Sequence, residues 1–364
     1  MVKINTIDAI NKSVEAAEKG GHRAHLGGSQ IGAPCERALW YQFRWTDKAQ
    51  FDGRMLRLFR RGQNEEDVMI ADLRAAGVEV VELDPSTGNQ VRIAAVSGHF
   101  GGSIDGTAKG IKEMPTEWVL LEFKTHNEKS FKELQKKGVE AAKPQHFAQM
   151  QVYMYRTGAK ACYYMAVNKN TDHLYGELVR ANDKFGADLI AKASDVIKAE
   201  APPPKISRDP SWYQCRFCDF SDVCHQEKWP EINCRTCANA SPVVHDDPLH
   251  EGPAVWRCGH WDQQIPEDAQ REGCEDHRYV PDLIQIGGVE VIKQNKTENT
   301  TTFNVGGHVV TNGKAPLGYS SEELPQIFKK PEYANAAAIK AARSIGGKVE
   351  FVGPSDEELD APPF

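Results

Sequence analysis

The sequence predicts an α/β or α+β fold around a mixed central sheet, and three observations support this class. Strand-like runs rich in β-branched residues alternate with longer segments of helical periodicity along the first 200 residues. Gly77 follows one long helical segment, and a turn at 85–88 separates two strand-like runs. The prolines at 202–204 end the last helix of this part as a stiff linker. Strands and flanking helices in this order indicate helices packed on a mixed sheet.

Individual elements follow from these patterns. We expect helices at 5–19, 51–76, 128–142 and 183–200, an aromatic helix within 29–45 that starts at Cys35, and a helix that begins at Pro144 and contains Gln149 and Tyr153. We expect strands at 78–83, 90–96, 118–121, 160–167 and 173–180.

Length and composition are those of an ordinary soluble protein. The chain has 364 residues, of which 40% are hydrophobic and 26% charged, enough for one large domain and one or two small ones. The formal charge of −7 argues against a general nucleic-acid coat protein. No stretch approaches the roughly 20 apolar residues of a membrane span, and the first residues lack a signal-peptide core. We therefore expect a cytoplasmic protein, whose nine cysteines indicate metal binding rather than disulfides.

The segment from Gly98 to Tyr155 carries the candidate chemistry. Glu122 and Lys124 end a buried strand, where alternation places them on one face and turns Phe123 into the core. Asp105 follows a glycine-rich strand, and a hairpin would bring its carboxylate beside Glu122. Two carboxylates suit a hard divalent cation such as Mg²⁺ or Mn²⁺, and a lysine beside them suits a phosphate ester. An isolated triplet of this kind also occurs by chance on solvated strands.

The helix that begins at Pro144 adds a polar stripe. His146, Gln149 and Tyr153 fall on one helical face beside the acidic pocket. Such a stripe is unusual for a core helix, and it is typical of a helix that contacts a DNA backbone.

These residues, in this order, resemble the PD-(D/E)XK nucleases. Asp105, Glu122-Phe123-Lys124 and Gln149-x-x-x-Tyr153 are most similar to the RecB and YqaJ branch, which includes lambda-type phage exonucleases and CRISPR-associated RecB-like nucleases. The upstream Gly62-x-x-x-Glu66 matches a further element of that branch. Ile104 departs from the proline that gives the family its name. The resemblance covers roughly residues 25–225.

The resemblance implies a restriction-endonuclease-like core and roles for its residues. Asp105, Glu122, Glu66 and the Phe123 carbonyl would hold Mg²⁺ or Mn²⁺. Lys124 would position the attacking water, while Gln149 and Tyr153 would steady the scissile strand or the lysine. Family members often carry a Cys-x-Arg near the start, so Arg37 would touch a DNA phosphate, the alternative being an intramolecular salt bridge.

A first cysteine group lies just beyond the proline linker. Cys215, Cys218 and Cys224 need a fourth ligand, for which Cys35 is the candidate. Four thiolates suit either a [4Fe–4S] cluster or Zn²⁺. The resemblance to AddB-type and CRISPR-associated iron–sulfur nucleases implies the cluster, in a structural role.

A second group follows at once. A Cys-x2-Cys pair with two later thiols is a strong pattern for a closed zinc site, here Cys234, Cys237, Cys258 and Cys274. His260 and His277 are alternative ligands. The segment is too short to bury a core alone, so a metal would fold it.

The chain is expected to divide into three parts. These are a nuclease domain at 1–230, a zinc-binding module at 231–281, and a small α+β region at 282–364 that ends in a mobile acidic tail. In the last part we expect strands at 283–292, 301–310 and 349–352 and a helix at 335–345.

The function that the sequence predicts is that of a metal-dependent deoxyribonuclease, more an exonuclease than an endonuclease. Its expected partners are DNA and recombination, repair or replication proteins, and the family's setting is often a phage genome, which would place it in the host cytoplasm. Two rivals stay open: a DNA-binding or assembly protein that keeps the fold but does not cut, and a zinc-ribbon adaptor.

Overall fold

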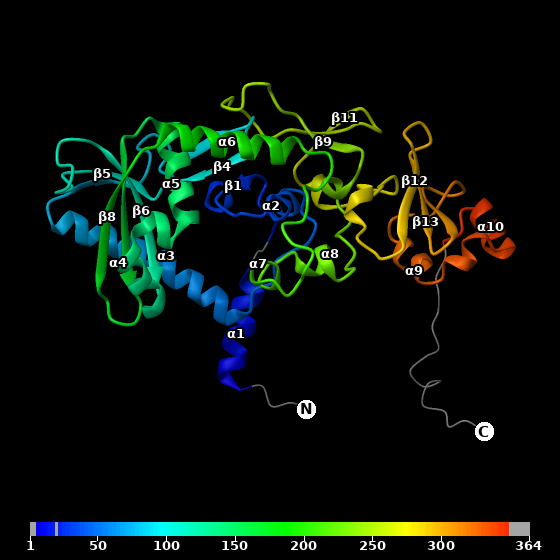
Figure 1. The fold of residues 1–364 in the computed structure, drawn as a ribbon, viewed down its shortest axis with the longest axis horizontal. Coiled ribbons are helices and arrows are strands. Elements are labelled where there is room, and N and C mark those ends of the chain that lie inside the picture. Colours follow the sequence, from blue (N-terminus) through cyan, green and yellow to red (C-terminus); the bar gives the residue numbers. More distant parts are fainter. Residues whose placement is uncertain (1–4, 19–20, 349–364) are drawn as a thin grey trace.

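The structure is a computed structural model that describes residues 5–18 and 21–348. The strand expected at 349–352 and the acidic tail lie outside the described residues. The molecule is elongated, with the five-stranded sheet at one end and the C-terminal strands at the other (Figure 1).

Three helices open the chain, as expected. They are α1 (Thr6–Ala17), α2 (Glu36–Phe43) and α3 (Gly53–Ala75). Asn5 and Asp52 cap α1 and α3, because each side chain accepts a hydrogen bond from a backbone N–H in the first turn. Gly77 then takes a left-handed φ of 82°, which a glycine adopts without strain, and the chain leaves α3.

The central sheet is mixed, which confirms the predicted fold class. Its strands, in spatial order, are β2 (Glu79–Val81), β5 (Gly106–Lys109), β6 (Val119–His126), β7 (Ala161–Asn168) and β8 (Leu174–Arg180). Strands β6 and β7 run parallel, and the other neighbours are antiparallel. The parallel pair needs a crossover, which two helices supply.

The crossover helices lie next to each other in sequence. Helix α4 (Glu128–Ala142) is capped by Asn127, and α5 (Pro144–Thr157) begins with proline at its first position. Helix α6 (Asp183–Lys198) follows β8 and packs on α5. Helix α4 has the predicted bounds, α5 begins at the predicted proline, and α6 ends two residues before the predicted end.

The two faces of the sheet have separate cores. Met69, Ile70 and Leu73 of α3 pack with Leu121 and Phe123 on one face. Buried residues of α5 and α6 pack on the other face, together with the opposite set of side chains from β6 and β7. Strand alternation therefore turns the even-numbered residues of β6 toward α5.

A second three-stranded sheet adjoins α2 and α5. Its order is β1 (Leu26–Gly27), β4 (Phe100–Ser103) and β3 (Arg92–Ala95), with a 3₁₀ turn, η1 (Gly28–Gln30), after β1. Strand β4 leads directly to Asp105 and β5.

The cysteine-rich region consists of short elements. They are α7 (Tyr213–Arg216), α8 (Ser221–His225), η2 (Cys234–Thr236), η3 (Ala269–Arg271) and a sheet of β9 (Ala240–Pro242), β10 (Trp256–Cys258) and β11 (Gln263–Ile265). Arg235 is 1% exposed, stacks 3.7 Å from the Trp45 ring centre, and donates to the carbonyls of Ala24 and Phe43. This arginine joins the region to the N-terminal part of the chain.

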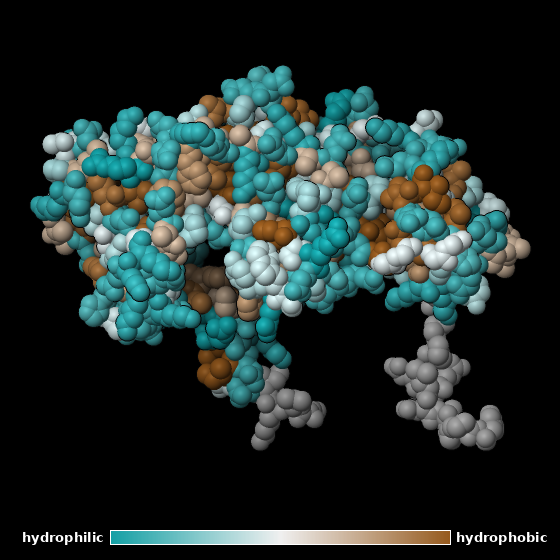
Figure 2. Space-filling model, viewed as in Figure 1, coloured by the Kyte–Doolittle hydropathy of each residue, from teal (hydrophilic) through white to brown (hydrophobic). Residues whose placement is uncertain are grey.

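The C-terminal region differs from its predicted strands. It holds η4 (Pro281–Leu283), β12 (Val289–Asn295), β13 (Thr300–Val305), β14 (His308–Asn312), α9 (Leu324–Lys329), η5 (Pro331–Asn335) and α10 (Ala337–Ser344). The strand predicted at 283–292 is wrong in its first half, because Pro281 starts a 3₁₀ turn. The strand predicted at 301–310 is two strands, because Gly306 and Gly307 have positive φ and form a hairpin turn. Apolar side chains form a visible patch over this region (Figure 2), and Val291, Ile292 and Val309 are exposed there.

Candidate active site

The structure places Asp105 beside Glu122. Gly106 of β5 pairs with Leu121 of β6, so Asp105 and Glu122 lie one step further along the two antiparallel strands. One Asp105 carboxylate oxygen, Oδ2, accepts a hydrogen bond of 2.8 Å from the Phe123 N–H. The backbone of β6 thereby fixes the first carboxylate against the second.

Glu122 and Lys124 share a face of β6, as alternation predicts. The Lys124 ammonium donates to Glu122 Oε1 and, at 3.0 Å, to the Phe123 carbonyl oxygen. Gln149 of α5 donates from Nε2 to the other Glu122 oxygen at 3.0 Å. Phe123 itself is 2% exposed and points into the opposite core. Both oxygens of Glu122 are therefore held in place.

Burial shapes the electrostatics of this cluster. Burial raises the pKa of Glu122 to about 7, and it also raises the pKa of Asp105. Although burial opposes the charge of Lys124, Glu122 and Asp105 beside it raise its pKa above the ordinary value. The cluster therefore keeps a charged ammonium next to carboxyls that hold protons more tightly than usual.

Glu66 on α3 belongs to the same electrostatic cluster. Burial raises its pKa to about 7, and the charge of Asp105 acts in the same direction. Its helix runs close to the end of β6, since a Cβ at Gly62 would lie 3.9 Å from the Thr125 hydroxyl oxygen. Three carboxyl groups from β6, α3 and the loop before β5 thus influence one another.

Tyr153 closes the far end of the cluster. Its side chain is 4% exposed and lies against two glycines. A Cβ at Gly102 would come within 2.2 Å of the Tyr153 hydroxyl oxygen, and a Cβ at Gly28 within 2.8 Å of its ring. Glycine at both positions leaves room for this ring.

Arg37 lies away from this cluster of carboxyls, beside the proline linker. Its side chain is 7% exposed, and it donates from Nε to the Tyr41 hydroxyl and from Nη1 to the Pro203 carbonyl, both at 2.8 Å. Two internal hydrogen bonds thus hold the guanidinium, and its expected contact with a DNA phosphate stays a prediction. Among the described residues Arg37 forms no salt bridge, and it ties the proline linker to α2.

The first cysteine group gathers at one cavity. Cys35 at the start of α2 lines it together with Cys215, Cys218 and Cys224 from α7, α8 and the loop between them. All four are free thiols. Burial raises the pKa of Cys218 to about 11, and Cys35 and Cys224 act in the same direction. Cys162, by contrast, is a buried core residue.

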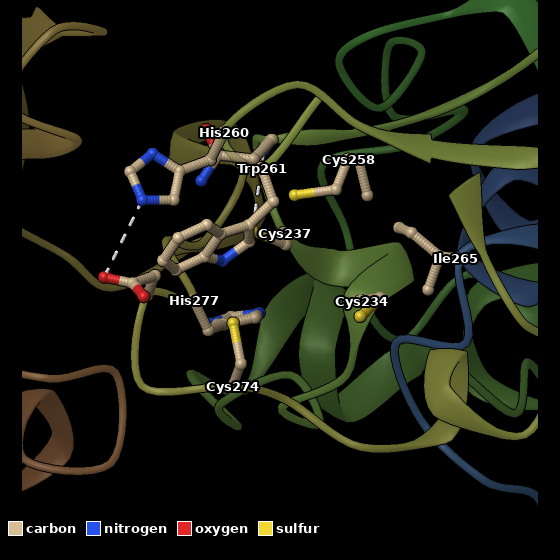
Figure 3. A pocket seen from close by; sticks show the side chains of 11 residues that line it. Cys234, Cys237, Cys258, His260, Trp261, Ile265, Cys274 and His277 are labelled. Atoms are coloured by element: carbon tan, nitrogen blue, oxygen red, sulfur yellow. Dashed lines mark hydrogen bonds and ion pairs between the residues drawn. The ribbon is translucent and has the colours of Figure 1, made fainter. Parts of the chain in front are cut away.

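The second cysteine group lines another cavity (Figure 3). Cys234, Cys237, Cys258 and Cys274 reach it from three separate segments. Burial raises the pKa of Cys234 to about 12, with the other three cysteines acting in the same direction.

The two histidines beside this cavity have other partners. Both ring nitrogens of His277 are engaged, Nε2 with the Thr236 hydroxyl at 3.1 Å and Nδ1 with the Ser321 hydroxyl at 2.8 Å. The His260 ring turns toward Asp276, at 3.9 Å. The cysteines are therefore the better-placed ligand candidates.

Neither cavity is a ready-made coordination sphere. Within residues 5–18 and 21–348, no group of three or more His, Cys, Asp or Glu side chains is arranged to hold a metal ion. The [4Fe–4S] prediction therefore rests on four thiols that line one cavity, and the zinc prediction rests on four thiols that line the other.

The sequence analysis singled out His146 but missed the polar network to which it belongs. His126 continues the row of Glu122 and Lys124 on β6, and its Nε2 lies 2.8 Å from the Tyr164 hydroxyl. The same hydroxyl lies 3.0 Å from Nδ1 of His146 on α5. The period of two from Glu122 to His126 was the available signal.

Comparison with known proteins gives one family. Residues 18–225 match the family described as the PD-(D/E)XK nuclease superfamily. No curated protein matches this chain. No helix among the described residues is long and apolar enough to cross a membrane.

The solved structures that this chain matches include two of one exonuclease. LHK-Exo in complex with dAMP is 18% identical with a TM-score of 0.35, and an alkaline exonuclease (LHK-Exo) from Laribacter hongkongensis is 21% identical with a TM-score of 0.34. Each comparison covers 51% of this chain and 90% of the other. The structure of SSO0001 is 13% identical with a TM-score of 0.38, covering 60% of this chain and 95% of the other.

Proposed function

We propose that this chain, which belongs to the PD-(D/E)XK nuclease superfamily, hydrolyses phosphodiester bonds of DNA with the help of Mg²⁺ or Mn²⁺. The observation that carries the proposal is the convergence of Asp105, Glu122 and Lys124 at the β5–β6 junction.

The donor set fits a hard cation. Asp105, Glu122 and the Phe123 carbonyl offer only oxygen atoms, which Mg²⁺ and Mn²⁺ prefer, and Glu66 adds a fourth oxygen donor from α3. These four residues would hold the cation. The chemistry that such a cation supplies when bound is polarisation of a phosphoryl oxygen and a lower pKa for water.

The remaining residues act through position and charge. Lys124, held by Glu122 and the Phe123 carbonyl, would orient the attacking water and offset negative charge on the phosphate. Gln149 holds the second oxygen of Glu122, so its role is to fix that carboxylate. Tyr153 packs against Gly102, near the charges of Glu122 and Asp105, and would steady the scissile strand or Lys124.

A cleavage assay tests the proposal. Purified protein would be incubated with linear and with circular DNA in Mg²⁺, Mn²⁺ or a chelator. We expect cation-dependent degradation of linear DNA only, as an exonuclease requires, and loss of cleavage in Asp105→Ala and Glu122→Gln. Glu133→Gln, which removes the charge of an exposed glutamate paired with Lys137 on α4, is the matched control.

Other outcomes would favour the rivals. Cleavage of circular DNA would indicate an endonuclease. DNA binding without cleavage, unchanged in Asp105→Ala, would indicate a DNA-binding protein that keeps the fold. DNA binding that ignores Mg²⁺ but disappears with the second cysteine group would indicate a zinc-dependent adaptor.

The two groups of cysteines that line cavities are the basis of a second proposal, that of structural metals. We propose a [4Fe–4S] cluster at Cys35, Cys215, Cys218 and Cys224, and Zn²⁺ at Cys234, Cys237, Cys258 and Cys274. Elemental analysis and the visible absorption of anaerobically purified protein test both. Zinc in both cavities, without iron, would overturn the cluster.

We also propose a cellular location, a division into domains and a class of partners for this protein. Nine free cysteines suit a reducing compartment such as the cytoplasm, of the host if the gene is a phage's. Domains at 1–230, 231–281 and 282–364 and partners in recombination, repair or replication fit this function. Limited proteolysis and copurification test them.

A further inference from the structure

A chain of hydrogen bonds runs from Lys143 to His146 along the edge of the proposed active site. The Lys143 ammonium donates to the Ser130 hydroxyl oxygen at 2.7 Å, and that oxygen lies 3.0 Å from Nδ1 of His126. His126 Nε2 lies 2.8 Å from the Tyr164 hydroxyl, which lies 3.0 Å from Nδ1 of His146. Four consecutive contacts thus connect the two histidines to one lysine.

These hydrogen bonds have one direction, because the Lys143 ammonium at the start can only donate a hydrogen bond. An ammonium has no acceptor, so Lys143 donates to Ser130. In the described part of the chain the Ser130 hydroxyl contacts no acceptor besides His126 Nδ1, so it donates there. His126 then carries its proton on Nε2 and donates to Tyr164.

The last step fixes His146. The Tyr164 hydroxyl accepts from His126, so its own proton goes to His146 Nδ1. Burial, with Lys143 and Lys124 nearby, lowers the pKa of His126 to about 4, and burial with Lys124 nearby lowers the pKa of His146 to about 3. Both rings are neutral at pH 7 and carry one proton each.

This network of hydrogen bonds lies beside Glu122, where the substrate would bind. Tyr164 pairs in register with Glu122 across the parallel strands β6 and β7, so both stand on the face that α5 covers. His146 lies three residues before Gln149, which holds Glu122, and the His126 and His146 ring centres are 5.9 Å apart. His146 is only partly buried, and its Nε2 has no partner among the described residues.

We propose that His146 is a phosphate-binding residue, whose Nε2–H donates to a backbone phosphate of the bound DNA strand, and that the Lys143–Ser130–His126–Tyr164 chain holds it in that tautomer. This proposal rests on the proposed nuclease function only in taking DNA as the ligand. A neutral N–H suits a phosphodiester oxygen because it donates without adding a charge beside Lys124.

Nuclear magnetic resonance tests the tautomer independently of any activity. Two-bond ¹H–¹⁵N spectra of protein labelled in its histidine rings report which nitrogen carries the proton, and His146→Gln identifies the signal. We expect His146 to be Nε2–H in the intact chain and a mixture of tautomers in Tyr164→Phe. Thr171→Ala, which removes a hydroxyl beside His173, should alter only His173. A proton on Nδ1 of His146, or an unchanged tautomer in Tyr164→Phe, would overturn the positioning role.

DNA binding tests the phosphate contact. The probe is a fluorescein-labelled oligonucleotide, with a chelator present so that it stays intact. We expect His146→Ala to weaken binding about 10- to 100-fold, as for a lost hydrogen bond to a charged group, and His146→Gln, which keeps an N–H, to weaken it less. Binding by His146→Ala equal to that of the intact chain would overturn the proposal. If the intact protein binds this DNA but never cuts it, the proposed nuclease function is wrong. The binding of His146→Ala and His146→Gln still decides whether His146 contacts a phosphate.

Discussion

The carboxylate site and the two cysteine cavities are built in opposite ways. Asp105, Glu122 and Lys124 lie within one hairpin, and hydrogen bonds from Phe123 and Gln149 already hold the carboxylates. The cysteines come from distant segments, as far apart as Cys35 and Cys224, and burial raises the pKa of Cys218 to about 11 and that of Cys234 to about 12. The difference indicates that strand register brings the two candidate carboxylates together, with Gln149 of α5 holding one of them, whereas the cysteines come together only through the packing of distant segments.

The largest expected effect is that of Asp105→Asn, which should lower the cleavage rate but not the stability of the fold. Asp105→Asn should lower the cleavage rate on the order of 10³-fold, because several kcal/mol of charge stabilisation are lost. Its melting temperature should not fall, since the substitution removes a buried charge. Single-turnover kinetics and calorimetry measure the two effects. A fall in stability with an unchanged rate would assign Asp105 to the fold instead.

A substitution in the second cysteine cavity should lower the stability but not the cleavage rate. Cys258→Ser should release the zinc and lower the melting temperature by roughly 10 °C, because structural zinc contributes folding free energy. The cleavage rate per folded molecule should stay near that of the intact chain. Ser241→Ala, at an exposed position of the neighbouring strand β9, is the control. Equal stability with and without zinc would remove the contrast between the two regions.

Gln149→Leu should have an intermediate effect. It deletes the donor to Glu122 Oε2 while keeping the volume, and such outer partners typically change metal affinity or activity 10- to 100-fold. Titration calorimetry with Mn²⁺ measures the affinity. An unchanged affinity would mean that β6 alone positions Glu122.

The smallest effect concerns pH. Glu66 and Glu122 have raised pKa values of about 7, and a carboxyl must lose its proton to bind a cation. Affinity for Mn²⁺ should therefore rise with pH, by about fivefold between pH 6 and 7 for each carboxyl that must lose its proton, and level off above pH 8. An affinity that is flat from pH 6 to 8 would show that neither carboxyl binds the cation.

The sequence was sufficient where local periodicity decides the structure. Alternation placed Glu122 and Lys124 on one face, and helical spacing brought Gln149 toward them. It was not sufficient where the tertiary structure decides: the sequence does not show that Arg37 donates to the Pro203 carbonyl, 166 residues away, and a glycine pair divides one predicted strand into β13 and β14. The histidine network was missed because Tyr164 joins it from a neighbouring strand, which no single-segment pattern contains.

The proposed chemistry requires that one cation binds between Asp105, Glu122 and the Phe123 carbonyl. Anomalous diffraction from crystals soaked in Mn²⁺ tests this requirement, with crystals of Glu122→Gln as the comparison. We expect one manganese peak within coordination distance of both carboxylates, and its loss in the variant. A manganese peak elsewhere, or none at this position in the intact protein, would contradict the proposed site.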